Sequence, residues 1–114
     1  MKIPLLLALV ALTVGAASAA DSAVDAGLAA ITQLGAINGQ ALACKEQDVA
    51  ARAKQLMLIH APRTSQYGTA FEQATQQGFL NQVHGATGCP AASELAGRID
   101  AVAADLNAKL PVAQ

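Results

Sequence analysis

The feature that most constrains the fold is an apolar repeat at steps of three and four residues, which recurs in four successive segments of this 114-residue chain. Such spacing places apolar side chains along one face of a helix, whereas a half-buried strand would alternate them. The chain is also rich in alanine and poor in aromatic and β-branched residues, which favours helix over sheet. The repeat therefore predicts an all-α protein.

Three breaks separate these segments: one near Cys44, one at residues 61–63 and one at residues 84–88. We expect helices over about 22–43 and 45–60, a third that starts near 64 or at the capping box 69–72, and a fourth from Pro90 to residue 110. Prolines define the ends near residues 61 and 111. The first break contains no proline, so the first two helices are either separate or one long helix kinked near Cys44.

Each expected helix carries an apolar stripe that could face a shared core. Short connections between four amphipathic helices predict a small bundle of four helices, within a range of three to five, or an orthogonal helical array. The stripes comprise Val24, Leu28, Ile31, Leu34, Ile37 and Ala41, then Val49, Ala53, Leu56 and His60, then Tyr67, Phe71, Ala74 and Gly78, and finally Leu95, Ile99, Val102, Leu106 and Leu110.

The N-terminus has the pattern of a secretory signal peptide. Lys2 precedes an apolar run over residues 3–14, and Ala17-Ser18-Ala19 fits the small-x-small rule of cleavage sites. An uncleaved anchor is disfavoured because the run is shorter than the roughly 20 residues that span a bilayer. We expect residues 1–19 to be removed and residues 20–114 to form a single helical domain without a membrane span, in the periplasm or secreted.

Cys44 and Cys89 are the two cysteines of the chain. In an oxidising compartment such a pair in a small domain most often forms a disulfide. A metal or redox site is disfavoured because the chain has no Cys-x-x-Cys and no histidine at ligand spacing from either cysteine. The sequence therefore predicts one disulfide, which would join the end of the first helix to the start of the fourth.

Small residues recur every fourth position at Gly35, Gly39 and Ala43. On a helix they form one narrow row, against which another helix could pack closely. Asn38-Gly39 is also a hairpin dipeptide, but no alternating strands flank it. We interpret the row as a helix-packing strip; a bend in the chain and a ligand-facing groove are the alternatives.

Charge and motifs exclude several classes of function. The net charge is −1, no basic patch is present and aromatic residues make up 3% of the chain, so the requirements for nucleic-acid binding are not met. No nucleophile elbow, phosphate loop or dinucleotide fingerprint occurs, so we expect no enzyme and no cofactor. Met57 and His60 could together offer ligands to a soft metal, but a histidine that caps the end of a helix and a methionine that fills the core explain both residues better, so we expect no metal site.

Arg63 and Tyr67 lie at the break between the second and third segments and belong to the residue types enriched at binding hot spots. They are candidates for contact with a protein partner, the alternative being that Tyr67 covers the core and Arg63 is solvated. In plan, the chain resembles periplasmic acid-stress chaperones and some immunity proteins of secreted toxins. That resemblance covers architecture alone and implies no functional residue.

These patterns predict a small exported binding or accessory protein that acts through protein contacts, such as a chaperone, inhibitor or immunity factor. The alternative is a carrier of a small apolar ligand or metal ion held between helices.

Overall fold

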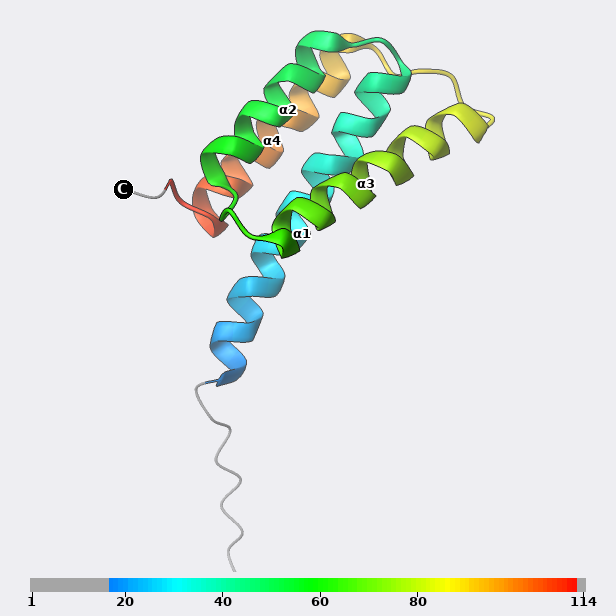
Figure 1. Cartoon of the computed structure of the whole chain (residues 1–114). Helices are drawn as coiled ribbons and strands as arrows, with labels where there is room; N and C mark the ends of the chain where they lie inside the picture. Colours follow the sequence, from blue (N-terminus) through cyan, green and yellow to red (C-terminus); the bar gives the residue numbers. More distant parts are fainter. Residues whose placement is uncertain (1–16, 113–114) are drawn as a thin grey trace, which may run out of the picture.

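The computed structural model describes residues 17–112, which form four α-helices (Figure 1). They are α1 (Ala17–Ala43), α2 (Gln47–His60), α3 (Ser65–His84) and α4 (Ala92–Lys109). The predicted all-α class and the bundle of four helices are confirmed. Most of the predicted signal peptide lies outside the described residues, and its expected cleavage site falls in the first turn of α1.

α1 and α2 are separate helices, because α1 ends in a hydrogen-bonded turn at Cys44 and Lys45. The backbone N–H of Glu46 donates to the carbonyl of Ala41, and that of Lys45 donates to the carbonyl of Leu42, which is the pattern of a Schellman cap. Lys45 has a φ of 60°, in the left-handed region that glycine usually occupies. Because a lysine holds this position, the sequence offered no glycine signal for the end of the helix.

The ends of α3 and α4 refine the other predictions. Thr64 is the N-cap of α3, so the earlier of the two expected starts is correct. The placement of Pro90 in the first turn of the fourth helix is wrong. Ala91 has an extended backbone with a ψ of 146°, and its carbonyl accepts the first helical hydrogen bonds, from the N–H groups of Glu94 and Leu95. Pro90 therefore precedes α4.

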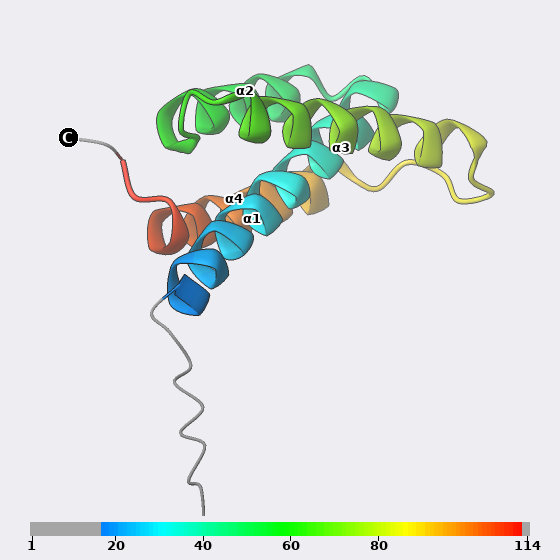
Figure 2. The ribbon, with the colours of Figure 1, turned by 60° about the horizontal axis from the view of Figure 1, so that its bottom comes forward.

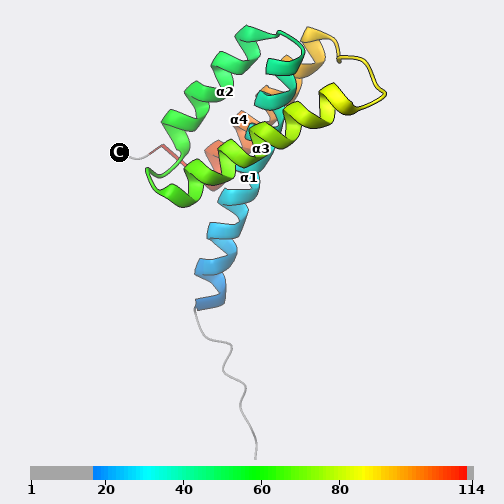
Figure 3. The same ribbon diagram turned by 45° about the vertical axis from the view of Figure 1, so that its right-hand side comes forward.

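α1 is the central helix and packs against each of the other three, while α2 also packs against α4. Figure 2 shows α2 and α3 in one layer above α1 and α4. In Figures 1 and 3, α2 and α3 diverge from the short connection that joins them, and α1 passes between and behind them. This divergence leaves part of the surface of α1 uncovered by either helix.

The core is built from the predicted stripes, with one exception. Val24 is 40% exposed, because the first turns of α1 project beyond the other helices (Figure 1). Burial of large aliphatic side chains from α1 and α4 contributes most of the stabilisation, at about 1.5–3 kcal/mol for each side chain. The largest fully buried apolar side chains are Ile31, Leu34, Leu95, Ile99 and Leu106.

Glycines bring α1 and α3 into backbone contact. A methyl group on Gly35 would lie 2.7 Å from the Phe71 carbonyl oxygen, and one on Gly39 would lie 2.6 Å from the backbone nitrogen of Phe79 and closer still to the Thr75 carbonyl oxygen. The structure thus places both glycines of the small-residue row against the backbone of α3. Ala43, the last member of the row, is half-buried at the end of α1.

Candidate functional site

An open groove of about 520 Å³ lies between α2 and α3, with α1 as its floor. It exists because α3 is held close to α1 by the glycine contacts while α2 packs against α1 and α4, which keeps the two groove walls apart. We refer to it as the α2–α3 groove. Its lining consists of Asn38 and Leu42 from α1, Lys54 from α2, and Phe71, Glu72, Thr75, Gln76, Phe79 and Leu80 from α3.

Four of the nine lining residues are large apolar side chains. Leu42 is 40% exposed and Phe79 and Leu80 are each 39% exposed, whereas Phe71 is partly buried against the core. Single exposed apolar residues are ordinary on protein surfaces, but several that share one hollow are typical of a binding site. The groove therefore offers an apolar surface on which a partner could be buried.

Two opposite charges stand on the facing walls. Lys54 lies on α2 and Glu72 on α3, and both line the groove. Within residues 17–112, neither side chain makes a hydrogen bond or an ion pair, in contrast to Arg52 of α2, which pairs with Asp100 of α4. An occupant could therefore be oriented by one acidic and one basic group of its own.

The floor contains a buried amide. Asn38 is 2% exposed, and its side-chain nitrogen donates to the hydroxyl oxygen of Thr75 at 3.1 Å. Its side-chain oxygen Oδ1 is buried and has no hydrogen-bond partner among the described residues. A buried carbonyl oxygen without a donor costs about 1–3 kcal/mol of stability. This group requires an explanation because such unpaired atoms are uncommon in folded proteins.

A second, smaller hollow of about 140 Å³ follows at the connection between α2 and α3. Leu58, one turn beyond Lys54 on α2, contributes to it and is 75% exposed. Gly68, one turn before Phe71 on α3, lies on its other side. Along α3 the lining of the α2–α3 groove itself runs from Phe71 to Leu80, a distance of about 14 Å at the helical rise of about 1.5 Å per residue.

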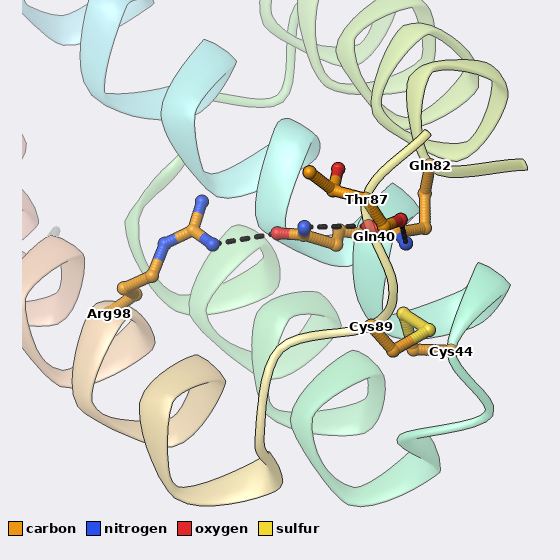
Figure 4. The surroundings of a disulfide bond; sticks show 6 residues. All are labelled: Gln40, Cys44, Gln82, Thr87, Cys89 and Arg98. Carbon is orange, nitrogen blue, oxygen red and sulfur yellow. Dashed lines mark hydrogen bonds between the residues drawn. A yellow bond between two sulfur atoms is a disulfide. The ribbon is translucent and has the colours of Figure 1, made fainter. Parts of the chain in front are cut away.

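Cys44 and Cys89 form the predicted disulfide, with their Cα atoms 5.7 Å apart (Figure 4). Cys44 follows the last residue of α1, and Cys89 lies in the connection between α3 and α4. The bond therefore ties that connection to the end of α1. Cys89 lies three residues before α4 rather than in its first turn, because α4 begins at Ala92.

A chain of polar side chains accompanies the disulfide (Figure 4). Arg98 of α4 donates to the side-chain oxygen of Gln40 at 2.7 Å, and the Gln40 amide nitrogen donates to the side-chain oxygen of Gln82 at 2.8 Å. The Gln82 nitrogen in turn donates to the carbonyl of Thr87 at 3.3 Å. These bonds link α1, α3, α4 and the connection between α3 and α4, which gives them a structural role.

Arg63 and Tyr67, the predicted partner contacts, do not share an exposed surface. Tyr67 is 7% exposed, and its hydroxyl lies 3.2 Å from the position that a methyl group on Gly27 would take. It therefore faces α1 and covers the core, as the alternative interpretation held. Arg63 is exposed at the smaller hollow, so only this member of the pair is accessible to a partner.

His60 and Met57, the weak metal candidates, both serve the packing of α2. His60 is 7% exposed, and its Nδ1 lies 2.7 Å from the carbonyl oxygen of Leu110, to which it donates. This hydrogen bond joins the end of α2 to the end of α4. Met57 is partly buried against the core.

Sequence reasoning missed the three polar residues that characterise the groove. Asn38 was visible as a polar residue inside an apolar repeat, which is a signal for a buried polar group, but the interpretation of this stretch rested on the small residues Gly35, Gly39 and Ala43. Lys54 and Glu72 carried no signal, because each lies among other polar residues of its own segment. Their relation depends on how α2 and α3 are placed in space.

No group of three or more His, Cys, Asp or Glu side chains within residues 17–112 is placed to hold a metal ion. None of the four described helices is long and apolar enough to cross a membrane. Comparison of the chain with models of protein families, with characterised proteins and with solved structures finds no match.

Proposed function

We propose that this protein is a small exported binding protein that takes an amphipathic helix of a partner protein into the α2–α3 groove. The observation that carries the proposal is the apolar groove itself, with Lys54 and Glu72 on its opposite walls, each without an ion-pair partner among residues 17–112. A helix that lays its apolar face into a hydrophobic groove is a recurring mode of protein recognition. Chaperones, inhibitors and immunity factors all act through contacts of this kind.

The shape of the groove favours a helix over a small ligand. Pockets for small molecules enclose most of the ligand surface, whereas this groove is open along its length. The stretch of about 14 Å between Phe71 and Leu80 matches about nine residues of a bound helix. We expect that helix to carry an acidic residue opposite Lys54 and a basic residue opposite Glu72, because both charges are then neutralised on docking.

Export is supported by the residues rather than by the fold. The N-terminal 19 residues have the charge, apolar run and small residues of a signal peptide. The disulfide is a bond that persists in oxidising compartments. We therefore propose that the mature protein meets its partner in the periplasm or outside the cell.

Site-specific photo-crosslinking tests this function. A photoreactive amino acid is introduced at Leu80, in the groove, and separately at Ile59, which is 50% exposed and outside the groove lining. Each protein is irradiated in periplasmic extract and in culture medium. We expect a protein partner to be crosslinked from position 80 and not from position 59, and the crosslinked segment of the partner to be helical and amphipathic.

A matched pair of substitutions supplies the quantitative control. Leu80→Lys should weaken binding of the crosslinked partner about tenfold, because it places a charge in the apolar contact, whereas Ile59→Lys should leave binding unchanged. Equal losses in both variants would contradict the groove as the binding site. A small molecule that copurifies with the wild type, seen by native mass spectrometry and absent from Leu80→Lys, would favour a ligand carrier instead.

A further inference from the structure

Asn38 is a polar residue in the lining of the α2–α3 groove that is neither exposed to solvent nor fully hydrogen-bonded within the described residues. Its nitrogen is bonded to Thr75, but its buried Oδ1 is unpaired among residues 17–112. Its position is rigid, because Gly35 and Gly39, on either side of it in α1, contact the backbone of α3. The groove floor thus holds one fixed hydrogen-bond acceptor.

Stability alone does not account for this residue. A leucine of nearly the same shape would fill the site without leaving a buried oxygen unpaired, and a half-satisfied polar group is less stable than an apolar core. Phe71 and Phe79 line the same hollow, and Thr75 is the polar side chain to which the Asn38 nitrogen donates. An acceptor in such a place gains its hydrogen bond when an occupant brings a donor.

The side chains around Asn38 also restrict which kind of hydrogen-bond donor an occupant can bring. A charged lysine or arginine would pair with Glu72 on the wall, whereas at the floor the neutral Asn38 amide carries no charge to compensate its desolvation, which is costly. An aromatic ring that carries an N–H or O–H meets both requirements, since the ring packs between aromatic neighbours and the polar edge reaches the amide. Oδ1 is covered in the free protein, so side chains of the lining must move to admit the ring.

We infer that the helix bound in the groove is anchored by a tryptophan or tyrosine whose N–H or O–H donates to Asn38 Oδ1. This inference rests on the proposed function and specifies the partner more narrowly. Asn38 then distinguishes an aromatic side chain that carries a hydrogen-bond donor from a purely apolar side chain of the same size. Lys54 and Glu72 then set the direction of the helix, and Asn38 sets its register.

Two synthetic peptides test the inference. Each is a helical peptide of about 12 residues with a leucine stripe, glutamates on one flank and lysines on the other. One carries tryptophan at the centre of the stripe; the other carries benzothienylalanine, in which sulfur replaces the indole N–H. Affinities are measured by calorimetry. Because the protein contains no tryptophan, a blue shift of the indole emission reports entry of the anchor alone.

We expect the wild type to bind the tryptophan peptide at least about tenfold more tightly than its isostere, because the isostere leaves the oxygen of Asn38 unpaired. Asn38→Leu should bind both peptides equally. Gln76→Leu, a matched change at an exposed position of the lining, should preserve the preference. The two peptides are compared on the wild type, so the test does not depend on the folding of any variant.

The outcomes separate the two proposals. Equal affinity of the wild type for both peptides would contradict a hydrogen bond from the aromatic anchor to Asn38. The groove would remain a helix-binding site. A preference that persists in Asn38→Leu would overturn the assignment of Asn38. If neither peptide binds the wild type, the result contradicts helix binding in the groove and therefore also the aromatic anchor.

Discussion

Gly39 and Gly97 both lie inside helices, yet a methyl group added to each would meet opposite surroundings. At Gly39 it would meet the backbone of α3, at the Thr75 carbonyl and the Phe79 nitrogen, whereas at Gly97 of α4 no heavy atom of a neighbour lies within 4 Å. Backbone atoms cannot turn aside as a flexible side chain can. The close packing of α1 on α3 therefore requires glycine at position 39. Gly97 is an exposed helical position, where glycine only lowers the helix propensity.

We expect Gly39→Ala to destabilise the protein by about 1–3 kcal/mol, because α1 and α3 must move apart. Gly97→Ala should instead stabilise it by about 0.5–1 kcal/mol, because alanine loses less conformational freedom in a helix. Urea denaturation followed by circular dichroism measures both. A stability unchanged by Gly39→Ala would mean that α3 does not pack closely on this face of α1.

At the scale of the elements, the helix ends show why some boundaries were predictable and others were not. Pro62 follows α2 closely, and the sequence indicated that end of the helix correctly. The end of α1 depends on Lys45 in a left-handed conformation, which the propensity of lysine opposes. The start of α4 depends on the extended backbone at Ala91, which its sequence does not demand.

The contact between the ends of α2 and α4 carries a prediction about the two histidines. His60→Ala should destabilise the protein by about 2 kcal/mol, because it leaves the Leu110 carbonyl without its donor and removes a buried ring. His84→Ala is the matched control, since His84 is exposed at the end of α3, and it should change stability by less than about 0.5 kcal/mol. Chemical denaturation compares them, and equal effects would rule out the link between α2 and α4.

At the scale of the whole molecule, the chain is held by a central helix and by one covalent bond between distant segments. α1 contacts all three other helices, and the disulfide spans a sequence separation of 45 residues that includes α2 and α3. A crosslink over so long a loop restricts the unfolded chain much more than the folded one. Both walls of the α2–α3 groove, on α2 and α3, belong to the closed loop, whereas its floor on α1 precedes Cys44.

Replacing both cysteines by alanine should lower the free energy of unfolding by about 4 kcal/mol, mainly through the larger entropy of the unfolded chain. The midpoint of urea denaturation measures the change, with helix content followed by circular dichroism. A reductant should shift the midpoint of the wild type toward that of the double variant and leave the double variant unaffected. A wild type that is insensitive to a reductant able to break the bond would contradict the prediction.

The sequence by itself determined the all-α class and most of the core, because the apolar stripes, alanine content and prolines act over a few residues. The pairing of Cys44 with Cys89 followed because the chain has no other cysteine. Only the tertiary structure decided that Tyr67 faces inward, that Lys54 and Glu72 stand on opposite walls, and that Asn38 lies under an apolar groove. These relations depend on where α2 and α3 diverge over α1. The residue pattern within one helix carries no information about how far apart two other helices lie.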